Sequence, residues 1–269
     1  MSAAEARNGY DRRQFLGRAG TAGAGVLAGT TALGVLAPSF AEAKKGGVKK
    51  SDLEILQAAQ IAEALAVTTY TNIIETAPFF AHIPDDDQGY LTAARQEEMS
   101  HYLLEEGVTH KPSAFTSFYY PEKMFSDAQT TINTLVTLED AFIAAYLVGV
   151  RNFSTPALRV TAARIMGIES DHRTLARVVA GEVSSADGGP LESTTGAQKH
   201  AESIDPPNNN GYERTLSWKH ISQAVEALLP FVEKKAASKA GFDTSKSYRF
   251  EPFTPSLPVA LGEFHSFAG

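Results

Sequence analysis

The sequence predicts an all-α fold: a bundle of four long helices with a long crossover, then a fifth helix and an extended tail. Three observations carry this prediction. Apolar residues recur at intervals of three and four over long stretches. No stretch of useful length alternates apolar and polar residues as a half-buried strand would. The connection between the second and third predicted helices is long enough to cross the bundle.

The first two helices follow a basic linker. Ser51 is expected to cap the first helix, with Glu54 three residues later completing a capping box. No Gly or Pro interrupts this helix before Pro78. The second helix is expected at 88–106 and to end at Gly107, a residue type that suits the position after a helix.

The second half of the chain contains three further helices. The third is expected at 127–151, and Pro156 opens the fourth, because the missing N–H of proline costs nothing at a first helical position. The fifth helix is expected to bend or break at Pro230. The predicted units are a signal peptide at 1–43, a linker at 44–50, the four-helix bundle at 51–181, a loop at 182–216, the fifth helix at 217–240 and an extended Pro- and Phe-rich tail at 241–269.

The composition excludes several kinds of protein and metal site. The 269 residues are 43% hydrophobic and 20% charged, which is typical of a globular protein. The chain contains no cysteine, which excludes disulfides, thiolate zinc sites, iron–sulfur clusters, covalently attached haem and a cysteine nucleophile. A formal net charge of -7 argues against a nucleic-acid-binding surface. Any bound metal must therefore use oxygen and imidazole ligands.

Residues 1–43 have the features of a twin-arginine signal peptide. Arg12 and Arg13 precede a weakly apolar stretch at 19–40, and the triplet Ala41-Glu42-Ala43 fits the A-x-A pattern of a cleavage site. A transmembrane anchor is the weaker alternative, because glycines dilute the apolar stretch and a span needs about 20 strongly apolar residues. The sequence predicts export by the twin-arginine machinery to the periplasm or the exterior, with a membrane tether if the signal is not cleaved.

Each of the four bundle helices carries a glutamate in small or apolar surroundings, and two of these glutamates precede a histidine by three residues. Residues three apart share a helix face, so each such pair can present an oxygen and a nitrogen to one point. The order Glu, Glu-x-x-His, Glu, Glu-x-x-His is the ligand set with which four-helix bundles hold two metal ions in their core. The predicted ligands are Glu63, Glu98, His101, Glu139, Glu169 and His172.

These residue types suit a pair of divalent cations. Two cations held close together repel each other, and four carboxylates supply the negative charge that offsets the repulsion. Carboxylate and imidazole ligands together favour iron or manganese, while the absence of thiolate disfavours copper(I) and structural zinc. We expect two metal ions, iron in preference to manganese. An isolated Glu-x-x-His motif usually lies on a solvated surface. The prediction therefore depends on finding all six residues, in this order, on four predicted helices.

Four further side chains are expected beside the ligands. Glu97 and Asp171 each adjoin a ligand in the sequence and can orient a ligating histidine, although a solvated position explains them equally well. Tyr70 and Tyr146 each lie seven residues beyond a ligand glutamate and so nearly on its helix face. Simple core packing is the alternative for both tyrosines.

The region from about residue 52 to 177 resembles the ferritin-like superfamily, and within it the branch of exported bacterial ferritin-like proteins and plant desiccation-related proteins. The resemblance implies the same six side chains as metal ligands. The chain departs from the pattern of this branch at Ala66, where a second glutamate often follows the first. The matching stretches are Ile55 to Tyr70, Glu98-Met99-Ser100-His101, Leu138-Glu139-Asp140 with Ala144-Ala145-Tyr146, and Ala162 to His172.

Three functions remain open from the sequence. The first is a di-metal oxidoreductase that uses oxygen or peroxide and acts as a ferroxidase, peroxidase or catalase. Because the chain has no cysteine, it has no rubredoxin-like electron donor of its own. The second is a stress- or desiccation-associated structural or binding protein in which the metal only stabilises the bundle. The third, which is weaker, is a cage-forming iron store. A homo-oligomer also stays open, since no interface can be read from the sequence.

Overall fold

The computed structural model of the protein describes residues 48–182, 191 and 216–256. The predicted signal peptide, nearly all of the predicted loop at 182–216 and the end of the tail from 257 lie outside the described residues. Within them, the all-α prediction is confirmed, with one small sheet added. The bundle consists of α3 (Lys50–Thr76), α4 (Asp85–Thr109), α5 (Ala128–Asn152) and α6 (Pro156–Glu182), and the short 3-10 helix η2 (Pro78–His82) joins α3 to α4.

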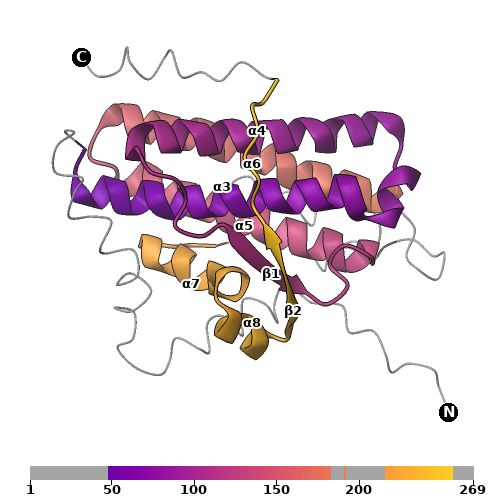
Figure 1. Ribbon diagram of the computed structural model, residues 1–269. Helices are drawn as coiled ribbons and strands as arrows, with labels where there is room; N and C mark the ends of the chain where they lie inside the picture. The colour runs from indigo at the N-terminus through magenta and orange to yellow at the C-terminus, as the bar shows by residue number, and fades with distance from the viewer. Residues whose placement is uncertain (1–47, 183–190, 192–215, 257–269) are drawn as a thin grey trace.

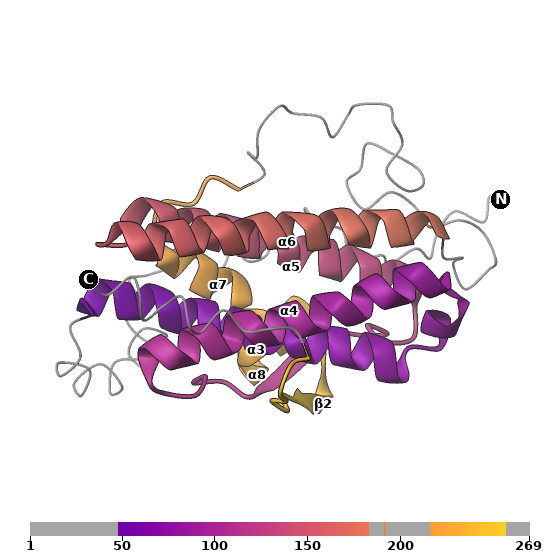
Figure 2. The same cartoon turned by 90° about the horizontal axis from the view of Figure 1, so that it is seen from above.

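The four helices are arranged as two pairs. α3 packs along α4 and α5 packs along α6, and contacts of α3 with α5 and of α4 with α6 join the pairs (Figures 1 and 2). α5 is long and apolar enough to cross a membrane, with a mean hydropathy of 1.3 over its most apolar window, but 89% of that window is buried inside the protein. The apolar character of α5 is therefore what its packing against the other helices requires.

Several of the predicted helix ends are wrong by one to three residues, including the start of α4, which lies at Asp85 and not at residue 88, and both ends of α5. α3 begins at Lys50, so that Ser51 lies in its first turn, and Lys49 is an N-cap without a side-chain hydrogen bond. α4 continues through Gly107 to Thr109, and His110 takes the left-handed conformation at φ 54°. A buried tertiary contact holds this last turn, because the Thr109 hydroxyl donates to the side-chain oxygen of Gln60 at 3.1 Å.

The crossover from α4 to α5 contains a strand that the sequence did not predict. β1 (Ser117–Pro121) pairs antiparallel with β2 (Phe242–Arg249), which lies in the predicted extended tail. The pairing register shifts between Phe118 and Tyr120, and β1 has only five residues, so neither strand leaves a clear alternating pattern. Phe118 and Tyr120 are both fully buried, which shows that the core packing of these aromatic rings holds the strand in place.

The predicted fifth helix at 217–240 is two helices, α7 (Ile221–Val232) and α8 (Lys234–Ala240). Pro230 lies inside α7, and the break falls at Glu233, whose φ of -116° and ψ of 119° are extended. Because proline has no N–H, it weakens the helix one turn before the break. α7 packs against α3, α5 and β1, so this unit covers the side of the bundle that carries the sheet (Figure 1).

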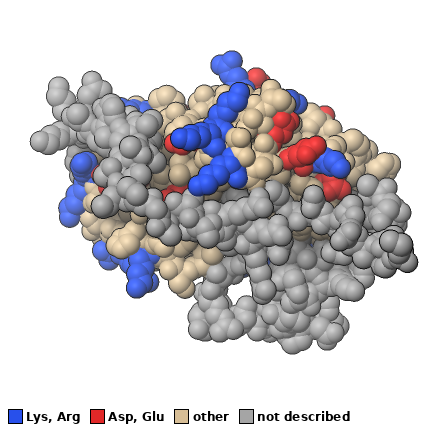
Figure 3. Space-filling model, turned by 90° about the horizontal axis from the view of Figure 1, so that it is seen from below, with Lys and Arg blue, Asp and Glu red and all other residues tan. Residues whose placement is uncertain are grey.

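The outer side of this added unit is charged. α8 has the sequence KKAASKA and contains no acidic residue. Lys and Arg side chains gather on the face of the molecule that is seen from below (Figure 3). The inner side is apolar, since Phe231 and Ala237 are fully buried. The unit is therefore an amphipathic cover for the bundle.

Residues 250–256 form a strap over α4, the helix that carries Glu98 and His101. The Phe250 ring contacts the Tyr102 ring at a centroid distance of 4.7 Å. The Arg95 guanidinium lies over the Phe253 ring at 5.4 Å. The Ser256 N–H donates to the side-chain oxygen of Gln96 at 2.8 Å. The contacts extend over about two turns of α4, from Arg95 and Gln96 to Tyr102, so the strap braces the outer face of this helix (Figure 1).

Replacing Gly149 by alanine is expected to destabilise the bundle by about 1–3 kcal/mol. A Cβ atom at this position would lie 2.8 Å from Phe153 Cε2 and 3.3 Å from the Ala162 Cβ, and the Phe153 ring is buried. Gly167→Ala is the matched control, because nothing lies within 4 Å of a Cβ there. That change is expected to stabilise α6 by up to about 1 kcal/mol. Urea unfolding of both variants measures the difference, and equal stability of the two would contradict the packing argument.

Candidate metal site

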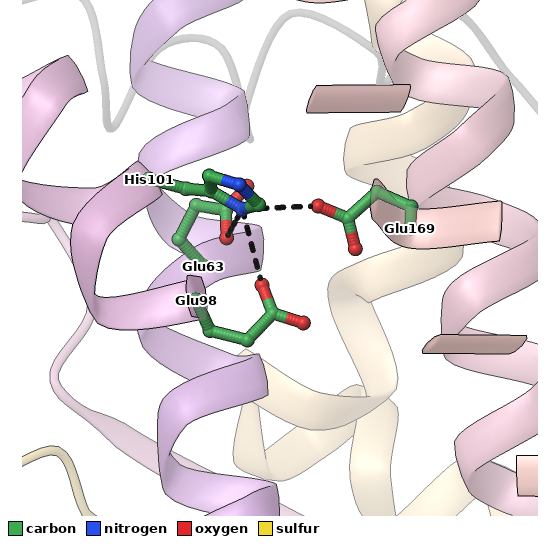
Figure 4. A group of neighbouring side chains, drawn as sticks. All are labelled: Glu63, Glu98, His101 and Glu169. Carbon is green, nitrogen blue, oxygen red and sulfur yellow. Dashed lines mark ion pairs between the residues drawn. The ribbon is translucent and has the colours of Figure 1, made fainter. Parts of the chain in front are cut away.

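Three helices bring the first group of predicted ligands together around the His101 imidazole. Glu63 lies on α3, Glu98 and His101 on α4, and Glu169 on α6 (Figure 4). His101 Nδ1 lies 3.2 Å from Glu169 Oε1, 3.5 Å from Glu63 Oε2 and 3.6 Å from Glu98 Oε2. The i,i+3 spacing on α4 and the small residues around Glu63 on α3 allow this convergence.

A second group forms beside the first around His172. Its members are Glu98, Glu139, Glu169 and His172, so α5 contributes the remaining glutamate. His172 Nδ1 lies 2.9 Å from Glu98 Oε1 and 3.6 Å from Glu169 Oε2. In each group the ligand atoms lie within 4.8 Å of one another. Glu98 and Glu169 belong to both groups and are therefore placed where a carboxylate could bridge two cations.

Buried polar atoms without hydrogen-bond partners are concentrated in this cluster. Eight such atoms of the described residues belong to the six predicted ligands, and every one of the six contributes at least one. The close contact of His172 Nδ1 with Glu98 Oε1 does not have the geometry of a hydrogen bond. The four glutamates are at most 2% exposed. Unsatisfied buried polar atoms cost free energy, so a cluster of them needs an explanation. Divalent cations fit, because carboxylate oxygens and imidazole nitrogens facing one point are the donor set that iron and manganese accept.

Without metal, the cluster retains extra protons. Burial raises the pKa of Glu63 and of Glu139 well above its ordinary value, and the neighbouring carboxylates raise it further. Burial alone would lower the pKa of His101 and His172, but the surrounding carboxylates raise it well above its ordinary value. Burial opposes ionisation of Glu98 as well, but His172 and His101 hold the pKa of this glutamate well below its ordinary value.

One of the two acids expected beside the ligands contacts the site and the other does not. Glu97 Oε2 lies 2.8 Å from His172 Nε2, so the imidazole has Nδ1 toward the cluster and Nε2 toward this carboxylate. This contact would fix the tautomer that a metal-bound histidine needs. Asp171 is exposed on α6. The solvated alternative therefore describes Asp171, and the orienting role falls to Glu97.

Glu97→Gln is accordingly expected to weaken metal binding by about 10- to 100-fold, because a glutamine cannot hold the His172 imidazole as firmly as a carboxylate. Asp171→Asn makes the same chemical change beside the same histidine, but on the exposed face of α6. We expect no change in affinity for this variant. Titration of both metal-free variants with ferrous or manganous ion measures the effect, and equal affinities would contradict the orienting role of Glu97.

Both tyrosines hydrogen-bond ligand carboxylates. The Tyr70 hydroxyl donates to Glu139 Oε1 at 2.8 Å, and the Tyr70 ring lies edge-on to His172 at 5.8 Å. The Tyr146 hydroxyl donates to Glu63 Oε1. Burial and the neighbouring carboxylates raise the pKa of both phenols, which keeps them protonated as donors. Packing alone therefore does not describe these two residues.

Glu105, which was not predicted from the sequence, is an additional buried acid beside the site. Its side chain is 1% exposed, and Glu105 Oε1 lies 2.9 Å from the Tyr146 hydroxyl oxygen, within hydrogen-bond distance. Burial raises the pKa of Glu105 well above its ordinary value. The signal was available, because Glu105 follows Glu98 by seven residues and His101 by four on one face of α4. Glu105 thus supplies an acid near the site despite Ala66.

A buried ion pair is formed by the residues that follow two of the predicted ligands in the sequence. Arg173 on α6 donates to Asp140 Oδ1 on α5 at 2.8 Å, and both side chains are at most 10% exposed. Asp140 follows Glu139, and Arg173 follows His172. The pair therefore fixes the distance between α5 and α6 beside these ligands. Its charges compensate each other, whereas the ligand cluster carries an excess of carboxylates.

Comparison with known proteins agrees with the fold and the geometry. Residues 51–182 match the family described as Ferritin-like domain, which covers all four bundle helices and all six converging side chains. Neither the curated proteins nor the solved structures contain a significant match to this chain. Ferritin-like domains often bind metal, and the two acidic and histidine groups here could hold it. Residues 51–182 of this chain therefore form a ferritin-like domain.

Proposed function

We propose that the ferritin-like domain binds two metal ions, iron in preference to manganese, and uses them in oxidoreductase chemistry with oxygen or peroxide. One observation carries the proposal: six side chains from four helices converge, with eight buried polar atoms that have no hydrogen-bond partner among the described residues. Four carboxylates would match the charge of two divalent cations. When bound, the metal pair would supply one-electron redox chemistry.

The residues of the chain have distinct roles in this proposal. Glu98 and Glu169 would contribute to both metal positions, because both belong to the two groups. Glu63 with His101 would complete one position, and Glu139 with His172 would complete the other. Glu97 orients His172 through its Nε2 atom. Tyr70 and Tyr146 hold Glu139 and Glu63 by hydrogen bonds from their phenols, so the carboxylates are positioned before any metal arrives.

Elemental analysis of the purified protein tests the proposal, followed by oxidation assays. We expect about two iron or manganese ions per chain and oxidation of added ferrous ion when oxygen or peroxide is supplied. Peroxide consumption without added iron would indicate the catalase-like form of the same chemistry. Fewer than one metal ion per chain, after reconstitution with excess ferrous or manganous ion, would exclude the dinuclear site.

The enclosure of the site favours a second candidate, a stress- or desiccation-associated protein in which the metal only stabilises the bundle. The four glutamates are at most 2% exposed, and His101 is 9% exposed. A closed site is typical of a structural metal. A metal-loaded protein with raised thermal stability and no turnover of ferrous ion or peroxide would support this candidate over the oxidoreductase.

We also propose that the chain is exported by the twin-arginine route. The paired Arg12 and Arg13 support this proposal, together with the weakly apolar stretch and the A-x-A triplet at 41–43. Replacing both arginines by lysine keeps the charge but removes the paired arginines. We expect the variant to accumulate uncleaved in the cytoplasm, as measured by cell fractionation. Unchanged export of the variant would contradict the proposal.

A further inference from the structure

An apolar pocket lies directly beside the proposed metal site. Its walls come from all four bundle helices, and Ile221 at the start of α7 contributes to them. Glu105 and Tyr146 are part of the same lining. Because the Tyr146 phenol donates to Glu63, one side chain separates the pocket from a predicted metal ligand. The pocket therefore leads toward the Glu63 side of the cluster.

Small side chains at facing positions create the space. Ala59 on α3, Ala145 on α5 and Ala162 on α6 line the pocket, while Leu158 and Phe153 also contribute apolar surface. The enclosed part accommodates a molecule not much larger than water, and the rest is open toward solvent. A bulkier residue in place of any of these alanines would fill it.

The chemistry of the lining selects against a polar occupant. Almost all of the exposed lining is apolar. The Tyr146 hydroxyl is engaged by Glu63 and Glu105. Glu105 Oε2 is buried, and together with the Thr161 hydroxyl it contributes little to the exposed surface of the pocket. Peroxide has two hydroxyl groups, and placing each in such a site without partners costs roughly 2–7 kcal/mol. Dioxygen is small, neutral and apolar, so it leaves no unpaired group in the pocket.

We propose that this pocket admits dioxygen to the Glu63 side of the metal site and thereby makes dioxygen, not peroxide, the oxidant that reaches the site by this route. This inference rests on the proposed oxidoreductase function and narrows its substrate. Ala59, Ala145 and Ala162 set the width of the passage. The hydrogen-bonded Tyr146 and Glu105 side chains form its inner end.

Xenon is a suitable probe, because it is apolar, similar in size to dioxygen and taken up by dry apolar cavities. Xenon-pressurised crystals of the metal-free protein are expected to show xenon between Ala59 and Ala145. Ala59→Leu is expected to abolish this site. Ala58→Leu is the matched control, since Ala58 precedes it on α3 and lines a different apolar pocket between α3 and α7. Xenon beside Ala59 should persist in the control.

Stopped-flow kinetics of the iron-loaded full chain provide the second measurement. In Ala59→Leu, the second-order rate constant for ferrous oxidation by dioxygen is expected to fall about tenfold or more, because the leucine side chain blocks the pocket through which dioxygen reaches the metal site. The rate with peroxide should stay within about twofold, as should both rates in Ala58→Leu. Ala145→Val, a smaller change in the opposite wall, should give an intermediate loss with dioxygen.

The outcomes separate this inference from the proposed function. Metal binding and turnover without xenon beside Ala59 in the wild-type protein would overturn the inference alone, whether or not the leucine variants fold. Equal slowing with dioxygen and peroxide in Ala59→Leu would also overturn it, because general damage to the site explains that result. Xenon uptake by a protein that binds no metal would overturn the proposed function and the role of the pocket with it.

Discussion

Replacing Glu98 by alanine is expected to lower the metal content from about two ions per chain to below one. Glu98 belongs to both ligand groups, and within the described part of the chain its two buried oxygens form no hydrogen bond, although Oε1 lies 2.9 Å from His172 Nδ1. Its loss would remove a donor from each metal position. It would also remove negative charge that offsets the repulsion between the two cations. The affinity of the remaining position should fall by more than about 100-fold, which exceeds the effect of losing a supporting contact.

Metal content after reconstitution, measured by elemental analysis, checks this result. Glu106→Ala is the matched control on the same helix, because Glu106 contacts Tyr102 at 3.4 Å and belongs to neither ligand group. It should keep the wild-type metal content. Thermal unfolding of both metal-free variants shows whether each still folds. A folded Glu98→Ala protein with two tightly bound ions would place the metal site elsewhere.

The helices that carry the site could be predicted because they leave local signals. Glu-x-x-His puts both side chains on one face regardless of the tertiary structure, and Pro156 does begin its helix as expected. The convergence of the six side chains is now a geometric finding, while metal binding stays a prediction. Glu105 was not predicted, although its spacing from Glu98 places it on the same helix face, because it lies outside the order Glu, Glu-x-x-His, Glu, Glu-x-x-His.

Other features depend on contacts between distant segments and could not be predicted. In the sequence, β1 and β2 are separated by more residues than two bundle helices contain. The register shift between them also disrupts the alternation of buried and exposed residues that would have marked a strand. Tyr146 orients Glu63 from a helix that lies elsewhere in the sequence, so only the folded structure distinguishes this role from packing. Asp171 and Glu97 look alike as neighbours of ligands, and only helix packing shows which one reaches an imidazole.

The metal-free protein is expected to lose stability as the pH rises, and the metal-loaded protein to gain it. The pKa values of Glu63, Glu139 and Glu105 are raised by burial in the folded state, and the surrounding carboxylates raise those of His101 and His172. All five groups thus hold protons in the folded chain that they release on unfolding. When the unfolded state binds fewer protons, the free energy of unfolding falls with rising pH.

Glu98 affects the free energy of unfolding in the opposite direction, but at lower pH. Its pKa is lowered in the folded state, so its contribution is lost only as the pH falls below about 4.3, the ordinary value for glutamate. Between about pH 5.5 and 8, the raised groups therefore determine the trend, with the histidines acting above about 6.5. Metal-free protein prepared with a chelator should accordingly unfold at a lower temperature at the upper end of this range.

Metal ions compete with the same protons, which reverses the trend. Each ion must displace protons from the carboxyl and imidazole groups it binds, so the apparent affinity rises with pH and binding releases protons. At a free metal concentration of about 1,000 times Kd the ligand stabilises the fold by about 4 kcal/mol, or roughly 10 °C in a domain of this size. The difference in Tm between the two forms should widen from about pH 5.5 to 8 by a shift of this order.

Calorimetry of both forms across this pH range distinguishes a metal cluster from a structural acid cluster. If the buried carboxyl groups were hydrogen-bonded to one another, they would need no cation. Added ferrous or manganous ion would then leave the unfolding temperature unchanged at every pH. Glu98→Ala should show the same flat response, because it cannot hold the metal pair. If the Tm difference between the metal-loaded and metal-free forms widens with pH, and Glu98→Ala abolishes that widening, the buried carboxylates of α3, α4, α5 and α6 serve to bind metal. Without metal, the free-energy cost of burying these carboxylates increases as the pH rises.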